Sequence, residues 1–159
     1  MSVKATVFLD GAIAGIIGAV IIAVLFLFLD LVTHLPLYTP TVLGGSLFLS
    51  ADDLASTQGA RVSWRLTLMY TGIHGLVFIV LGVIGAQFLL STRRELNLGL
   101  SILVLFVILE FGFVGTALFL AAPILDLLDW VNVLIGNALA AIGMAIYLSL
   151  RHPTRRVTE

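Results

Sequence analysis

Four long apolar stretches dominate the sequence, and short polar segments separate them. The stretches cover about Val7–Val32, Leu66–Leu90, Leu98–Ala121 and Trp130–Leu150. Each exceeds the roughly 20 residues that a helix needs to cross the hydrocarbon core of a bilayer. Because backbone groups in lipid must be hydrogen-bonded within the chain, such runs predict helices. We therefore expect an all-α integral membrane protein with a single four-span domain over residues 1–159.

The composition agrees with this pattern and narrows the chemistry. Hydrophobic residues make up 60% of the chain, charged residues 11%, and the mean hydropathy is +1.18. A soluble domain is typically about 25% charged, so this chain has too little polar surface to cover a core in water. There is no cysteine, which excludes thiol nucleophiles, thiolate metal ligands and disulfides. The length leaves no room for a separate catalytic domain.

The positions of the basic residues predict the orientation. Four spans would put the two termini and the connection between spans two and three on one side of the membrane. That side holds six of the eight Lys and Arg residues, namely Lys4, Arg93, Arg94, Arg151, Arg155 and Arg156. Cytoplasmic segments carry such an excess. We expect an antiparallel four-helix bundle in a plasma membrane of the bacterial inner-membrane type, with both termini in the cytoplasm.

The first outer connection, residues 33–65, is too long for a simple turn. Thr39-Pro40 resembles an N-cap followed by a proline at the first helical position. The segment 41–49 that follows is apolar but too short to span. We expect it to lie in the membrane interface or to dip back into the bilayer as a re-entrant piece.

Small residues indicate which helix faces meet, because they let membrane helices approach closely. In span three, Glu110 lies on the same helix face as Gly99, Leu103 and Val114, and we expect this face to point inward. Spans one and four each carry a stripe of small residues at helical spacing: Gly11, Gly15, Gly18, Ala19 and Ala23 in the first, and Gly136, Ala140 and Gly143 in the fourth.

Ionisable residues gather in the outer half of the predicted bundle and form a candidate metal site. Asp30 and His34 are four residues apart, so they can converge on one helix face. With His74 and Glu110 they would give two imidazoles and two carboxylates, a set that suits iron, manganese or zinc, with copper plausible through the imidazoles. Haem is another candidate. The paired Glu-x-x-His motif of di-iron bundles is absent.

A structural role for Glu110 is the alternative. A charge at the bilayer centre costs at least about 2.5 kcal/mol, so Glu110 should be protonated or hydrogen-bonded to His74 or Asn137, and would then lock the bundle. A third interpretation is a pocket for a quinone or a lipid headgroup near the outer surface. The remaining polar cluster, Asp126, Asp129, Asn132 and Asn137, lies at the mouth and in the outer part of span four.

No motif in the sequence indicates a particular enzymatic reaction. The leading hypothesis is a small non-enzymatic accessory or assembly protein. It would be a helper or subunit of a larger inner-membrane complex, such as a respiratory or photosynthetic one, and its partners would be other membrane subunits or further copies of itself. A metal- or haem-binding redox protein and a quinone- or lipid-binding protein remain alternatives. The scattered basic residues do not form the folded surface that nucleic-acid binding needs.

Overall fold

The computed structural model describes residues 3–33, 35–49, 62–91, 97–120 and 129–152. Within these ranges the regular structure is entirely helical. The five helices are α1 (Val3–Thr33), α2 (Tyr38–Phe48), α4 (Trp64–Ser91), α5 (Leu98–Leu120) and α7 (Trp130–Arg151).

Four of these helices have the length and apolar character of membrane spans. They are α1, α4, α5 and α7, and they coincide with the four predicted stretches within a few residues at each end. Large apolar side chains are exposed on each of them, among them Phe28, Leu68, Phe111 and Leu150. Such a surface suits lipid rather than water. The prediction of an all-helical, multi-pass membrane protein is confirmed at this level.

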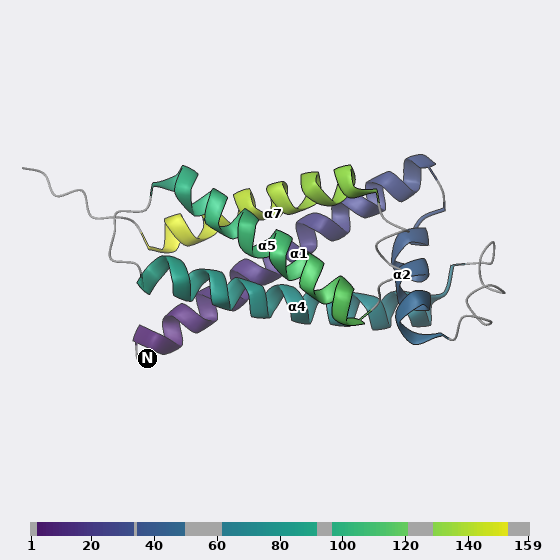
Figure 1. Cartoon of the computed structure of the whole chain (residues 1–159), viewed down its shortest axis with the longest axis horizontal. Helices are drawn as coiled ribbons and strands as arrows, with labels where there is room; N and C mark the ends of the chain where they lie inside the picture. The colour runs from purple at the N-terminus through teal and green to yellow at the C-terminus, as the bar shows by residue number, and fades with distance from the viewer. Residues whose placement is uncertain (1–2, 34, 50–61, 92–96, 121–128, 153–159) are drawn as a thin grey trace, which may run out of the picture.

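The four long helices lie lengthwise beside one another, and α2 lies across one end of them (Figure 1). The start of α1 and the end of α7 lie at the opposite end from α2 (Figure 1). The molecule therefore has an α2 end and a terminal end, and these two names are used below.

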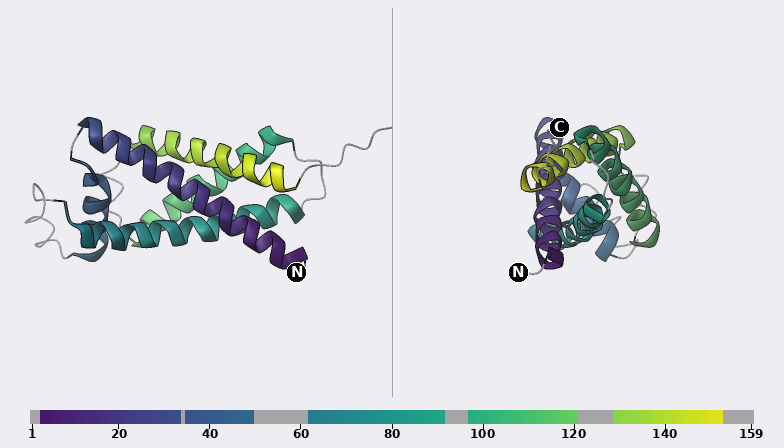
Figure 2. Two further views of the ribbon diagram at one scale, coloured as in Figure 1. Left: turned by 180° about the vertical axis from the view of Figure 1, so that it is seen from behind. Right: turned by 90° about the vertical axis from the view of Figure 1, so that its left-hand side faces the viewer.

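Glycines allow α1 and α4 to cross in direct backbone contact. A Cβ on Gly11 would lie 2.7 Å from Val83 Cα, and one on Gly82 would lie 2.7 Å from Gly15 Cα. A Cβ on Gly15 would overlap the carbonyl group of Phe78. The two helices cross here and diverge toward α2 (Figure 2). The small-residue stripe predicted for span one thus faces a neighbouring helix at Gly11 and Gly15.

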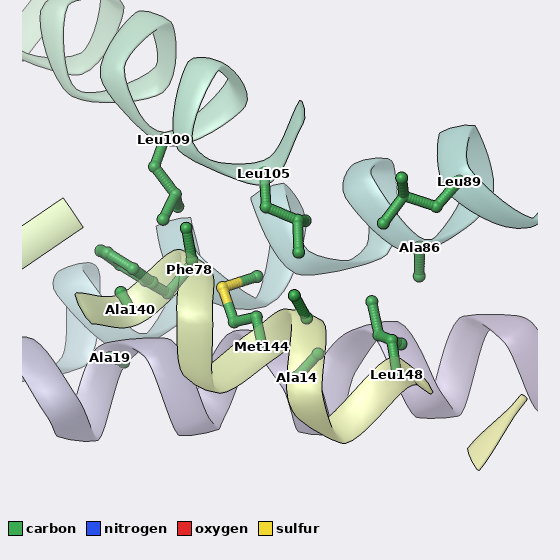
Figure 3. Packing of buried hydrophobic residues seen from close by; sticks show 12 residues of the cluster. Ala14, Ala19, Phe78, Ala86, Leu89, Leu105, Leu109, Ala140, Met144 and Leu148 are labelled. Carbon is green, nitrogen blue, oxygen red and sulfur yellow. The ribbon is translucent and has the colours of Figure 1, made fainter. Parts of the chain in front are cut away.

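The core lies beside this crossing, where α7 packs on α1. Met144 is fully buried and lies among apolar side chains that include Ala14, Phe78 and Leu105 (Figure 3). The expected inward face of span four is confirmed, because Ala140 is also fully buried and a Cβ on Gly136 would lie 3.4 Å from Leu25.

The inward face predicted for span three is wrong at Gly99 and Leu103, which are exposed, although Glu110 of the same face reaches Asn137 of α7. Leu103 is 55% exposed, whereas Leu105 and Leu109 are 0% and 1% exposed and form the buried face of α5. The reason lies on the neighbouring helix. Gly85 of α4 has no side chain, and a Cβ there would lie 2.5 Å from Leu105 Cδ2. A leucine of α5 therefore fills the space that a small residue of α4 leaves free.

The apolar piece between the first two spans is a helix, α2, and it begins earlier than expected. Its N-cap is Leu37, with a left-handed φ of 66°, and not Thr39. Pro40 therefore lies within the first turn, where its missing N–H removes no helical hydrogen bond. Gly44 packs on α4, since a Cβ on it would lie 2.5 Å from the carbonyl oxygen of Leu66. The Thr41 and Thr67 hydroxyls are 3.0 Å apart, within hydrogen-bonding distance.

Candidate functional site

A cavity of about 330 Å³ occupies the half of the bundle nearest α2. Residues of α1, α2, α4, α5 and α7 line it, and most of them are apolar. The polar lining residues are Asp30, Thr39, Thr67, Tyr70, Thr71, His74, Thr116 and Asn137. An apolar cavity of this size with a few polar groups is typical of small-molecule sites.

The cavity opens sideways between α1 and α4. All of its exposed lining residues lie on these two helices: Val20, Ala23, Val24, Leu27 and Thr71. The lining residues of α2, α5 and α7 are half-buried or buried. This agrees with the divergence of α1 and α4 on the α2 side of their crossing (Figure 2). Because the mouth lies along the apolar flank of two membrane-spanning helices, it faces lipid.

His74 lies on α4 next to the crossing of α1 and α4, where it lines the cavity. Its Nε2 is 3.3 Å from the carbonyl oxygen of Ala19, and its ring contacts the rings of Tyr70 and Phe78 at centroid distances of 5.8 and 4.7 Å. A carbonyl oxygen only accepts, so Nε2 carries the hydrogen. In the neutral ring Nδ1 is then an acceptor. Within the described residues it has no hydrogen-bond partner.

Asn137 and Glu110 join α7 to α5 at the cavity. Asn137 Nδ2 donates to Glu110 Oε1 over 3.0 Å, and Asn137 is 3% exposed. This is one of the two hydrogen bonds expected for a structural Glu110. Because the amide nitrogen is the partner of the carboxyl group, the amide oxygen of Asn137 remains an acceptor at the cavity wall.

Asp30 fixes the start of α2 over the cavity. It is 1% exposed, and its Oδ2 accepts from the Thr39 N–H over 2.9 Å while its Oδ1 accepts from the Thr39 hydroxyl over 2.5 Å. Leu37 has no side-chain acceptor for the first turn. A carboxyl group from α1 therefore caps α2 from a distance, which is the role of an ordinary N-cap side chain.

The structure does not gather the predicted metal ligands into one set. Asp30 is bonded to Thr39, His74 to Ala19 and Glu110 to Asn137. The part of the chain that the structure describes holds no group of three or more His, Asp or Glu side chains close enough to bind a metal ion. His34 lies outside the described residues.

The other members of the predicted polar cluster act locally. Asp129 caps α7, since its Oδ1 accepts from the Val131 N–H over 3.0 Å. Asn132 Nδ2 donates to Asp129 Oδ2 over 3.3 Å. Neither side chain lines the cavity, and Asp126 lies outside the described residues. Of this cluster, only Asn137 is placed at the candidate site.

A second polar cluster, at the terminal end, was not predicted. Asp10 is 1% exposed and accepts from the Tyr147 hydroxyl over 3.2 Å, from Arg151 Nε over 3.2 Å and from His152 Nε2 over 2.9 Å. Tyr147 and Arg151 are four residues apart and so share a helix face. That spacing, together with termini on one side, is the signal in the sequence that points to this cluster.

Comparisons with protein-family models, with curated proteins and with solved structures give no match for this chain.

Proposed function

We propose that this protein binds a small membrane-soluble molecule with a polar end, of the quinone or lipid class, in the cavity beneath α2. The cavity itself carries the proposal. It has the volume of a small-molecule site, about 330 Å³, and its mouth lies between two membrane-spanning helices. A ligand dissolved in the bilayer can enter through that mouth without passing through water.

The lining fits a ligand with an apolar body and one polar end. Apolar side chains of α1, α2 and α5 would contact the body, while His74, Tyr70 and Asn137 offer hydrogen-bonding atoms. In sites of this kind a few polar groups fix the orientation and apolar burial supplies most of the affinity.

We further propose that the four long helices form an antiparallel bundle in a bacterial-type inner membrane, with both termini in the cytoplasm. The basic residues flanking the spans support this orientation. The pairing of Asp10 with Arg151 and His152 supports the placement of both termini on one side of the membrane, because it holds the start of α1 against the end of α7. The cavity then lies in the outer half of the membrane, and α2 lies near the outer interface.

Saturable quenching of tryptophan fluorescence by decyl-benzoquinone tests the binding proposal. The chain has two tryptophans, and Trp64 and Trp130 begin α4 and α7. In lipid nanodiscs we expect quenching that saturates with quinone concentration. Ala23→Phe should weaken this binding at least tenfold, because the ring would enter the mouth. Ile16→Phe is the matched control, since Ile16 is exposed on α1 but does not line the cavity.

Linear quenching without saturation in the unaltered protein would contradict the binding proposal. Equal saturation in Ala23→Phe and Ile16→Phe would place the bound quinone elsewhere and would also contradict it.

A second proposal, an accessory role within a larger membrane complex, rests on uncovered glycines. A Cβ on Gly72, Gly75 or Gly115 would meet nothing within 4 Å. Small residues on a lipid-facing surface allow another helix to dock closely. The partner would be a subunit of an inner-membrane complex, for example a respiratory or photosynthetic one, or a second copy of this chain.

Native gels of mild-detergent extracts test the accessory role. We expect the protein to migrate in a species larger than the monomer, and Gly72→Leu to return it to the monomer position because the added side chain would keep a docked helix away. Ile84→Leu is the control, because Ile84 is already a large exposed residue of α4. Migration of the unaltered protein as a monomer, with nothing co-purifying, would contradict this role.

A further inference from the structure

Several polar side chains that line the cavity donate their hydrogen atoms to hydrogen bonds within the protein. His74 Nε2–H donates to Ala19, the Thr71 hydroxyl donates to the Thr67 carbonyl oxygen over 2.7 Å, and the Thr39 hydroxyl donates to Asp30. Each of these side chains is left with acceptor capacity only. The cavity wall therefore presents His74 Nδ1, Thr71 Oγ1 and the Asn137 amide oxygen as acceptors.

In the same set of groups, the second N–H of Asn137 is the one that can only donate. The hydroxyls of Tyr70 and Thr116 can donate or accept, and one N–H of Asn137 is not used by Glu110. A ligand with hydroxyl hydrogens can therefore form hydrogen bonds with more of these polar groups than a ligand that has only carbonyl oxygens. An acceptor left without a partner in an apolar site costs free energy.

Charge excludes a further class of ligand. Among the described residues, no lysine or arginine lines the cavity, and the ionisable side chains that line it are Asp30, Tyr70 and His74. A second carboxyl group, that of Glu110, is hydrogen-bonded to the lining residue Asn137. A phosphate group would lose its hydration here without meeting a cation, which is strongly unfavourable. Anionic phospholipid heads therefore do not fit.

We infer that the cavity selects a neutral headgroup that donates hydrogen bonds, the reduced quinol or a similar phenol, over the oxidised quinone and over anionic phospholipids. This inference rests on the proposed function and specifies the ligand of the same site. His74 Nδ1 is the acceptor assigned to one of the headgroup hydroxyls, because the Ala19 contact fixes its tautomer and ring orientation.

Competition against the saturable quenching by decyl-benzoquinone tests this selectivity. Decyl-hydroquinone, kept reduced under argon, should relieve the quenching with an affinity about tenfold higher than that of the quinone, the size of effect that one or two hydrogen bonds produce. The dimethyl ether of the same hydroquinone has lost both hydroxyl hydrogens and should bind no better than the quinone. Dioleoyl phosphatidylglycerol should not relieve the quenching.

His74→Phe locates the acceptor. We expect it to remove most of the preference for the quinol over the quinone, because the Nδ1 acceptor is lost while an aromatic ring between Tyr70 and Phe78 is kept. Ile16→Phe, outside the cavity, should keep the full preference. If His74→Phe does not fold, the comparison of hydroquinone with its dimethyl ether on the unaltered protein decides the question.

The outcomes separate the inference from the function on which it rests. Saturable quinone binding with equal affinity for quinone, hydroquinone and dimethyl ether would overturn the inference and leave the proposed function standing. Displacement by phosphatidylglycerol would overturn the exclusion of anions. Absence of saturable binding for every probe would overturn the proposed function itself.

Discussion

Gly15→Leu is expected to force α1 and α4 apart and to lower the free energy of unfolding by about 3 kcal/mol, the upper end of the range for overpacking. A Cβ at this position already overlaps the backbone of Phe78. Backbone cannot move aside as a flexible side chain can, so the whole helix must shift. Unfolding by sodium dodecyl sulfate in mixed micelles, followed by far-ultraviolet circular dichroism, measures the change.

Gly75→Leu is the matched control for this substitution. It adds the same side chain to α4, where a Cβ would meet nothing within 4 Å, and it should change the free energy of unfolding by less than about 0.5 kcal/mol, as exposed substitutions usually do. Equal destabilisation by the two variants would mean that the effect comes from adding a leucine to a glycine-rich helix and not from the crossing.

Asp30→Ala is expected to detach the start of α2 from α1. The substitution removes the acceptor of both hydrogen bonds from Thr39, and losing hydrogen bonds to a buried carboxyl group costs about 2–3 kcal/mol. Because α2 covers the cavity, quinone binding should weaken as well. Hydrogen exchange of the backbone amides in residues 38–48 measures the detachment, which should appear as faster exchange there and unchanged exchange in α7.

Two further variants distinguish the loss of the capping hydrogen bonds from the loss of the carboxylate charge. Asp30→Asn keeps an oxygen that accepts from the Thr39 N–H and should be milder than Asp30→Ala. Thr39→Val removes the hydroxyl bond only, and combining it with Asp30→Ala in a double-mutant cycle should show coupling between the two positions. Additive effects would contradict the capping role.

The spans and the closest helix contact were predictable because each depends on a local or periodic property. Length and apolarity define a span without reference to any neighbour. The glycines of α1 lie at helical spacing, and small residues at helix contacts follow from the absence of a hydrophobic driving force within lipid. The face of α5 was not predictable from α5 alone. Whether Leu105 or Leu103 points inward depends on the space that Gly85 leaves on another helix.

The candidate site was predicted only in part, for a related reason. His74, Asp30 and Asn137 were identified as unusual in an apolar setting, and all three line the cavity. Their hydrogen-bond partners were not predictable, because a backbone oxygen at Ala19 and a helix start at Thr39 have no sequence signal of their own. The cavity could not be predicted from the sequence either, because it arises from the divergence of α1 and α4 and from the position of α2 beside them.

The buried carboxyl group of Asp10 is synthesised long before the residues to which it is hydrogen-bonded. Its partners Tyr147 and His152 lie 137 and 142 positions later in the chain. The first helix therefore enters the membrane with a carboxyl group whose hydrogen-bonding partners have not yet been made, and such a group is costly inside a bilayer. Insertion of α7 brings Tyr147, Arg151 and His152 to Asp10. The carboxyl group of the first span therefore waits for its partners until α7 lies beside α1.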